Sequence, residues 1–253
     1  MADLPVLWQF KYSHYNEKAR WALDFKKIPH VRRSLLPGAH MPRVLWMTGQ
    51  KAVPVLVLDG KTIADSTQII EALETWRPDP PLYPRDPKER ERALALEEFF
   101  DEELGPHIRR AWFFEVMPNA DYTVAQIAVG RGALTRRVYR ALYPVIGTIM
   151  KMDMKINAAA AQLGREKVQA ALDRIAAELQ PSGYLVGGAF TVADLTAAAL
   201  LSPVLMPPEF PYPLINPPAS AANYRASIAG HSAFQWASDI YRRHRGPSME
   251  RPA

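Results

Sequence analysis

The alternation of hydrophobic and polar positions divides the chain into two parts. In its first third, short runs with strand character alternate with helical ones, and after that every long segment has helical periodicity. The runs PVLWQF (5–10) and HVRRSLL (30–36) predict two strands, separated by roughly the length of a β-α-β unit. The segment VPVLVLDGKTIAD (53–65) predicts two more strands, joined by a turn at Asp59-Gly60 because this pair tolerates positive φ. The first part is therefore expected to be one small mixed sheet carrying helices.

Two helices are predicted between and after these strands. The stretch YSHYNEKARWAL (12–23) places Ala19, Ala22 and Leu23 on one helical face together with Tyr15, and a serine stands where a helix cap is favoured. The charged residues of this helix lie off that face; they are Lys18, Arg20 and Asp24. The segment STQIIEALETW (66–76) is the second helix of this part.

The rest of the chain is expected to be helical. The segments 84–100 and 165–179 have helical patterns, and FTVADLTAAALL (190–201) opens with a capping box made by Thr191 and Asp194. We expect Asp194 to be structural for this reason. The proline-dense stretch 77–87 is a linker. The stretch SPVLMPPEFPYPLINPPA (202–219) is expected to be an extended loop or lid, and its apolar residues indicate that it packs on something.

The charge distribution does not indicate a nucleic-acid binder. The net charge of +5 is spread over both halves, whereas such proteins usually concentrate their charge on one patch. The densest basic stretch, 131–155, carries Leu134, Val138, Leu142 and Val145 at helical spacing. It predicts a helix with one solvated basic face; a surface for anionic membrane or nucleic acid is the alternative.

Composition excludes several kinds of chemistry. The 253 residues contain no cysteine, which excludes disulfides, thiolate metal sites and a cysteine nucleophile. The six histidines have no metal-ligand spacing, so we expect no metal. The N-terminus lacks the pattern of a signal peptide, and no apolar run approaches the ~18 residues that a membrane span needs.

Three motifs together resemble the cytosolic glutathione S-transferase superfamily, serine type. They are SHYNEKARWAL (13–23), KAVPVLVLDG (51–60) followed by IADSTQIIEAL (63–73), and FTVADL (190–195). The resemblance implies an α/β N-terminal thioredoxin-like domain over 1–80, a linker over 81–87 and an all-α C-terminal helical domain over 88–253.

The resemblance also implies a catalytic serine. Ser13 matches the residue that donates a hydrogen bond to the glutathione thiolate, with Tyr12 as the rival donor. A thiol of pKa ~8.5 is only about 3% ionised at pH 7, and a charge-assisted hydrogen bond worth roughly 1.5–3 kcal/mol lowers the pKa by about 1–2 units. One hydroxyl, helped by the positive end of a helix, is enough for this activation. The alternative is that Ser13 only caps the helix.

The remaining site residues follow from the same motifs. Pro54 is expected in the cis form, which leaves the backbone of Val53 free for the cysteinyl amide of glutathione. Further predicted contacts are Ser66 and Asp65 for the γ-glutamyl end, and Lys51 and, less surely, Gln50 for the glycine carboxylate. The helix around 109–117 suggests a pocket for a hydrophobic electrophile, formed by Tyr15, Trp112, Phe113 and Met117, although an aromatic cluster on a helix is more often core.

The resulting hypothesis is a cytoplasmic glutathione transferase, with a role in detoxification, that conjugates the glutathione thiolate to a hydrophobic electrophile. The family suggests a homodimer, and glutathione is its co-substrate. No metal, nucleic acid or membrane span is expected. The alternative is a non-catalytic member of the superfamily that serves as a ligand-binding or protein-interaction module, because fold does not fix function.

Overall fold

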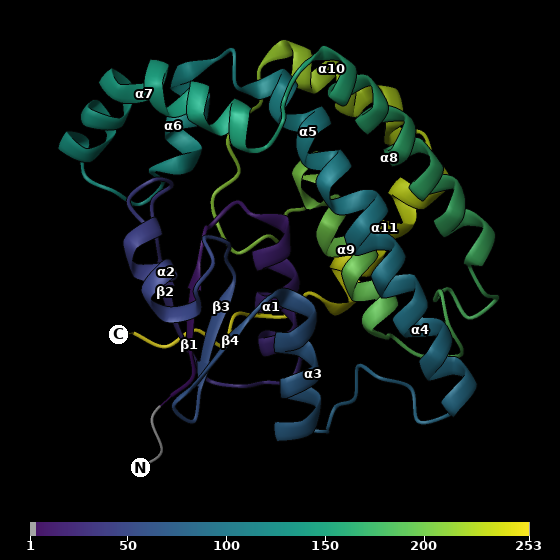
Figure 1. The fold of residues 1–253 in the computed structure, drawn as a ribbon. Helices are drawn as coiled ribbons and strands as arrows, with labels where there is room; N and C mark the ends of the chain where they lie inside the picture. The colour runs from purple at the N-terminus through teal and green to yellow at the C-terminus, as the bar shows by residue number, and fades with distance from the viewer. Residues whose placement is uncertain (1–3, 253) are drawn as a thin grey trace.

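A computed structural model describes residues 4–252 and contains one mixed sheet followed by a long series of helices (Figure 1). The sheet has the strand order β2-β1-β3-β4, with β1 parallel to β2 and antiparallel to β3. Strands β3 and β4 form the hairpin. The elements of this part are β1 (Val6–Gln9), α1 (His14–Phe25), β2 (Val31–Ser34), α2 (Met41–Thr48), β3 (Val55–Leu58), β4 (Lys61–Ala64) and α3 (Ser66–Trp76).

Every regular element described after α3 is a helix. They are α4 (Pro87–Phe99), the π-helix η1 (Phe100–Leu104), α5 (Gly105–Val116), α6 (Ala120–Ile127), α7 (Ala133–Asp153), α8 (Ala158–Glu178), α9 (Val192–Leu205), α10 (Ala219–Ala229) and α11 (Ser232–His244). The predicted fold class, a small mixed sheet followed by an all-helical part, is confirmed. Helix α1 packs against both α3 and α9, so one cluster of buried hydrophobic residues runs from the sheet into the helices.

Local signals placed most of these elements correctly. The hairpin turn has positive φ at Asp59 (47°) and Gly60 (77°), as its residue types predict. Helix α3 has the predicted bounds, and the capping box of α9 is present, with Thr191 as its N-cap and Asp194 accepting from the Thr191 backbone. Helix α2 was not predicted, because its N-cap, His40, makes no capping hydrogen bond and its apolar residues do not mark a buried face.

The charged residues of α1 are the main departure from the simple amphipathic pattern. Lys18 and Arg20 are fully buried and Asp24 is 6% exposed, although all three lie off the apolar face. The Lys18 ammonium lies 2.8 Å from the Glu97 carboxylate and also pairs with Asp101. Arg20 pairs with Glu17 of its own helix, and Asp24 pairs with Arg32 of β2, so polar partners rather than water cover this side of α1.

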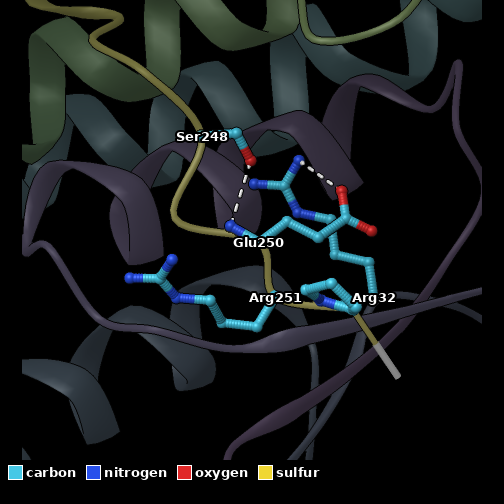
Figure 2. A pocket seen from close by; sticks show the side chains of 5 residues that line it. Arg32, Ser248, Glu250 and Arg251 are labelled. Atoms are coloured by element: carbon cyan, nitrogen blue, oxygen red, sulfur yellow. Dashed lines mark hydrogen bonds and ion pairs between the residues drawn. The ribbon is translucent and has the colours of Figure 1, made fainter.

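The C-terminal segment after α11 returns to the sheet. The backbone N–H of Arg251 donates to the carbonyl of His30 at 2.8 Å, next to the start of β2. Arg245 is buried and pairs with Glu17 and Asp24 of α1. Figure 2 shows Arg32 beneath this segment, in a cleft of about 460 Å³ lined by Arg32, Ser248, Glu250, Arg251 and Pro252. The segment thereby ties the last helix to the sheet.

The stretch 202–219 is partly helical, so the prediction of one extended loop is wrong at its start. Helix α9 continues through Pro203 to Leu205 and ends where Met206 adopts a left-handed conformation (φ 48°). Pro203 has no N–H to donate to the carbonyl four residues earlier, so α9 gives up one intrahelical hydrogen bond just before it ends. Residues 206–218 form the loop. They pack on other parts of the chain, as predicted, and the contacts are with Gln9 of β1 and Tyr12.

Candidate functional site

Ser13 is the N-cap of α1. Its backbone is extended (φ −86°, ψ 129°), and its hydroxyl oxygen accepts a hydrogen bond from the backbone N–H of Asn16 at 3.4 Å. The capping role is therefore realised. A hydroxyl that accepts from a helix can still donate its own proton, so the geometry is compatible with the predicted bond to a thiolate at this helix end.

Asn16 connects Ser13 to the residue before the cis proline. The Val53–Pro54 peptide bond is cis, as predicted. The Asn16 side-chain amide donates to the Val53 carbonyl at 3.4 Å, while its own carbonyl oxygen, Oδ1, is buried without a hydrogen-bond partner. A buried acceptor without a partner costs stability, so this atom is an unfavourable feature of the packing between α1 and the cis proline.

Asp65 and Ser66 lie at the same end of the sheet as Pro54. The β3–β4 register pairs Val55 with Ala64, which places Pro54 and Asp65 just beyond neighbouring strand ends. The Asp65 carboxylate caps α3 by accepting from the N–H groups of Thr67 (2.8 Å) and Gln68, and Ser66 is buried. Asp65 has φ 82°, which is unfavourable for a residue with a side chain and persists only where its surroundings require it.

Lys51 and Gln50 lie at the edge of this group. The Lys51 ammonium pairs with Asp153 at the end of α7, and the Lys51 carbonyl contacts the His40 ring at 3.0 Å. Gln50 is exposed, and its backbone N–H donates to the Thr48 hydroxyl. A carboxylate at Lys51 would therefore have to compete with Asp153.

Tyr12, the rival donor, is occupied by the proline-rich loop. Its hydroxyl donates to the carbonyl of Pro213, and its ring stacks on Phe210 with centroids 5.9 Å apart. Burial, and then the neighbouring Tyr212, raise the pKa of Tyr12 to about 12. The neighbouring Gln9 side chain donates to the Tyr212 hydroxyl at 2.5 Å. The loop thus lies over the junction of β1 and α1, next to Ser13.

The residues proposed for an electrophile pocket are largely buried. Trp112 and Met117 are 4% and 2% exposed, and Trp112 belongs to the continuous hydrophobic core. Phe113 packs against that core with part of its surface exposed. The Tyr15 hydroxyl donates to the Asp101 carbonyl at 2.7 Å. The structure thus places these aromatic side chains in packing contacts, and a pocket role for them stays a prediction.

Two polar groups next to the site were missed from the sequence. His14 is buried against α5, with its Nε2 atom 3.0 Å from the carbonyl of Gly105, and burial together with the Arg109 charge lowers its pKa to about 3. Thr67, the residue after Ser66, donates its hydroxyl to Asp101, which also binds Lys18. The partners lie 34 to 91 residues away along the chain, so no local pattern could indicate them.

Metal binding has no support in the part of the chain that the structure describes. Between residues 4 and 252, no group of three or more histidine or acidic side chains could hold an ion. None of the described helices is long and apolar enough to cross a membrane.

Comparisons with known proteins identify the superfamily. The model of the glutathione S-transferase N-terminal domain matches residues 7–81, and that of the C-terminal domain matches residues 158–225. Glutathione S-transferase U24 of Arabidopsis thaliana is 32% identical over 44% of this chain and 52% of its own length. This chain therefore spans about half the length of the first curated relatives that it matches.

A second relative is similar over much more of the chain. FtsZ-localized protein A of Caulobacter vibrioides is 26% identical over 78% of this chain and 75% of its own length. Among solved structures, a glutathione S-transferase from Methylobacterium radiotolerans in complex with glutathione sulfonate superposes with a TM-score of 0.53 at 22% identity, covering 93% of this chain and 95% of that one. At this identity the superposition shows the fold alone. The two matching domain models and the shared fold show that the chain belongs to the glutathione S-transferase superfamily.

Proposed function

We propose that this protein is an interaction module of the glutathione S-transferase superfamily that binds glutathione without relying on its turnover. The observation that carries the proposal is the packing of the loop 206–218 over the β1–α1 junction, where Pro213 accepts from Tyr12 and Phe210 stacks on the Tyr12 ring. An electrophile must reach the thiol next to this junction. In this structure the loop 206–218 itself occupies the space beside Tyr12 through which an electrophile would have to pass.

The residues present fit glutathione as a ligand. The N-terminal ends of α1 and α3 lie at one end of the sheet and present polar groups there, the half-buried Ser13 and the capping Asp65, where a peptide-like ligand would bind. The unfavourable φ of Asp65 at the start of α3 is a further sign of a conformation kept for binding. The γ-glutamyl end would lie at Asp65 and Ser66, and Ser13 would face the thiol.

The partner we propose is FtsZ or an FtsZ-bound assembly. The support is the relative named FtsZ-localized protein A, which matches 78% of this chain, against 44% for the plant transferase. Co-sedimentation with assembled FtsZ tests this: we expect the wild type to pellet with FtsZ and to stay in the supernatant without it. Absence of this protein from FtsZ pellets at micromolar concentrations contradicts the partner.

A transferase is the second candidate, and the position of Ser13 favours it. The Ser13 hydroxyl lies at the positive end of α1 and is only half-buried, with a long capping bond of 3.4 Å. Such a hydroxyl can donate to a thiolate and lower the thiol pKa. This candidate requires the loop 206–218 to move away from Tyr12 during turnover.

The ultraviolet difference spectrum of bound glutathione, titrated over pH, separates the two candidates. For the interaction module we expect glutathione to bind with the thiol midpoint of the free compound, in the wild type and in Ser13→Ala alike. A midpoint at least one pH unit lower in the wild type, lost in Ser13→Ala while binding persists, establishes the transferase. Lack of binding in both proteins contradicts the glutathione site itself.

A further inference from the structure

The C-terminal segment and β2 enclose a cleft away from the candidate site. This cleft of about 460 Å³ is lined by Arg32, Ser248, Glu250, Arg251 and Pro252, and we call it the tail cleft. The β1–β2 register pairs Val6 with Val31 at the start of both strands, and Arg32 is the next residue of β2. Ser13 follows the other end of β1. The tail cleft and the proposed glutathione site therefore lie towards opposite ends of the sheet.

Arg32 forms the buried side of the tail cleft. Its side chain is 1% exposed, and most of its donors have partners. The Nε atom donates to Nε2 of His30 at 2.9 Å, and Nη2 lies 2.8 Å and 2.7 Å from the two carboxylate oxygens of Asp24. The Nη1 atom is buried and has no hydrogen-bond partner among residues 4–252. Because Arg32 lines the cleft, this cationic donor is available to an anion that enters it.

Glu250 is the anion that lies in front of this donor. Its Oε2 atom is 3.7 Å from Nη1 of Arg32, which is too far for a hydrogen bond. The Glu250 side chain is 42% exposed, so it can turn into solvent at little cost, because exposed ion pairs contribute little to stability. Figure 2 shows its carboxylate at the edge of the Arg32 guanidinium. Glu250 thus marks a position for a negative group without satisfying Nη1.

Two further polar side chains of the tail cleft come from the C-terminal segment. The Ser248 hydroxyl accepts from the backbone N–H of Glu250 at 3.2 Å and keeps its own proton to donate. Arg251 is exposed, and its guanidinium forms no ion pair with the residues that the structure describes. Its backbone N–H is held by the His30 carbonyl at 2.8 Å. The cleft therefore offers a buried arginine donor, a hydroxyl and a second arginine at its rim.

We infer that the tail cleft binds the phosphate group of a small phosphomonoester in place of the Glu250 carboxylate. Among the lining residues, two arginines stand against one carboxylate, which favours an anionic ligand. A phosphate group has three terminal oxygens for the three donors, which are Arg32, Ser248 and Arg251, and guanidinium groups match its geometry. The volume of about 460 Å³ exceeds that of a phosphate alone, so an organic group can accompany it.

The bound phosphate would join two parts of the chain that are far apart in sequence. Arg32 belongs to β2, whereas Ser248 and Arg251 follow the last helix. The segment after that helix is already held here, because the Met249 N–H donates to the Asp24 carboxylate at 2.7 Å. A ligand that bridges both parts would hold this segment more firmly on the sheet. The inference goes beyond the proposed function and does not depend on glutathione or FtsZ.

Isothermal titration calorimetry of the full chain with glycerol 3-phosphate at pH 7.5, where the phosphate is mostly a dianion, tests the inference. We expect saturable binding that is about fivefold tighter in Glu250→Gln, which loses the competing charge, and about fivefold weaker in Arg251→Ala. Arg242→Ala removes an exposed arginine that does not line the cleft, so this matched control should bind as the wild type does. Absence of saturable binding to both the wild type and Glu250→Gln, or an affinity that neither variant changes, overturns the inference.

Two further titrations and the exchange of one amide test the ligand and its place. We expect inorganic phosphate to bind more weakly than glycerol 3-phosphate, and acetate more weakly still. Acetate that binds as tightly overturns the phosphate group as the ligand, and tighter binding of inorganic phosphate overturns the monoester. Saturating glycerol 3-phosphate should also slow the hydrogen exchange of the Arg251 amide, which donates to the His30 carbonyl. Binding that leaves this exchange unchanged takes place elsewhere and overturns the tail cleft as the site.

Discussion

Helices α1 and α7 depart in opposite ways from the rule that charged side chains face water and apolar side chains face the core. In α1 the charged side chains Glu17, Lys18 and Arg20 are fully buried. In α7 six large aliphatic side chains are at least 45% exposed. Both helices have an amphipathic sequence pattern, so the pattern alone does not decide which side meets water. What decides it is whether distant parts of the chain supply a partner for that side.

For α1 the partners are present in the same chain. Lys18 pairs with Glu97 of α4 and Asp101 of η1, and Arg245 from the C-terminal segment lies 2.6 Å from Glu17 and 3.0 Å from Asp24. For α7 the described part of the chain supplies no cover for the six exposed side chains. Helix α1 thus joins distant parts of the same chain through buried ion pairs, whereas the apolar side of α7 stays exposed.

Breaking the α1 cluster is expected to have the largest effect. Arg245→Ala leaves the buried carboxylate of Glu17 without one of its cations, and removing one member of a buried pair costs about 3–5 kcal/mol. We expect the free energy of unfolding, measured by urea denaturation at pH 7, to fall by that amount. Arg243→Ala, which removes a more exposed pair with Asp239, is the matched control and should cost about 0.2–1 kcal/mol. Equal losses in the two variants would contradict the role assigned to the buried cluster.

A smaller effect is expected from acidification, through His14 at the start of α1. Burial, and then Arg109, lower its pKa to about 3, so the folded state binds fewer protons than the unfolded state below pH 6.5. Its contribution to stability is present above pH 6.5 and is lost as the pH falls towards 3. At pH 5 the loss is about 2 kcal/mol relative to pH 7.5.

The measurement is the urea midpoint at pH 7.5 and at pH 5, in the wild type and in His14→Gln. We expect the wild type to lose more stability on acidification than the variant, by about the amount assigned to His14. Burial also lowers the pKa of His30, to about 4, so the variant keeps part of the pH dependence. Identical pH dependence in the two proteins would show that His14 titrates normally in the folded state.

The sequence could predict what depends on neighbouring residues. The hairpin at Asp59-Gly60, the bounds of α3 and the capping box at Thr191 all follow from residue types within a few positions of each other. The cis bond at Pro54 was predicted from the resemblance and is present. For the candidate site, the sequence placed Ser13, Val53 and Asp65 next to the ends of predicted strands and helices. In the structure these three residues lie at the same end of the sheet.

What could not be predicted depends on distance along the chain. Lys18 meets Asp101 83 residues later, and Glu17 meets Arg245 after 228 residues. Tyr12 meets Pro213 across 201 residues, so the sequence predicted a loop or lid that packs on something but not that it packs beside Ser13. A polar residue in a helix looks the same in sequence whether it faces water or a distant counter-ion. The exposed side of α7 was equally hidden, because a pattern of apolar residues does not say what covers them.

A modest effect is expected where the loop 206–218 meets the residues before α1. Tyr12→Phe removes the hydrogen bond to the Pro213 carbonyl, which is worth about 0.5–1.5 kcal/mol. Hydrogen exchange should show faster exchange of the loop amides, with a small change in global stability. Tyr139→Phe removes the similar bond to the Pro37 carbonyl and is the control that leaves the loop unchanged. Unchanged exchange in Tyr12→Phe would mean that other contacts hold the loop.

The smallest effect is expected from a truncation on the exposed apolar side of α7, and it sharpens the comparison most directly. In the dilute monomer, Leu142→Ala should change the free energy of unfolding by no more than about 0.5 kcal/mol, because Leu142 is already 51% exposed in the folded chain. The same truncation in α1, Leu23→Ala, removes a fully buried side chain and should cost about 2–5 kcal/mol.

Protein concentration then separates the monomer from the dimer. If α7 pairs with its copy, the thermal midpoint of the wild type rises with protein concentration, because association stabilises the folded state. Leu142→Ala should lose much of this rise, and Leu23→Ala should keep it at a lower midpoint. A cost in the dilute monomer as large as that of Leu23→Ala would mean that the apolar side of α7 is packed within its own chain, and α7 would then be no different in kind from α1.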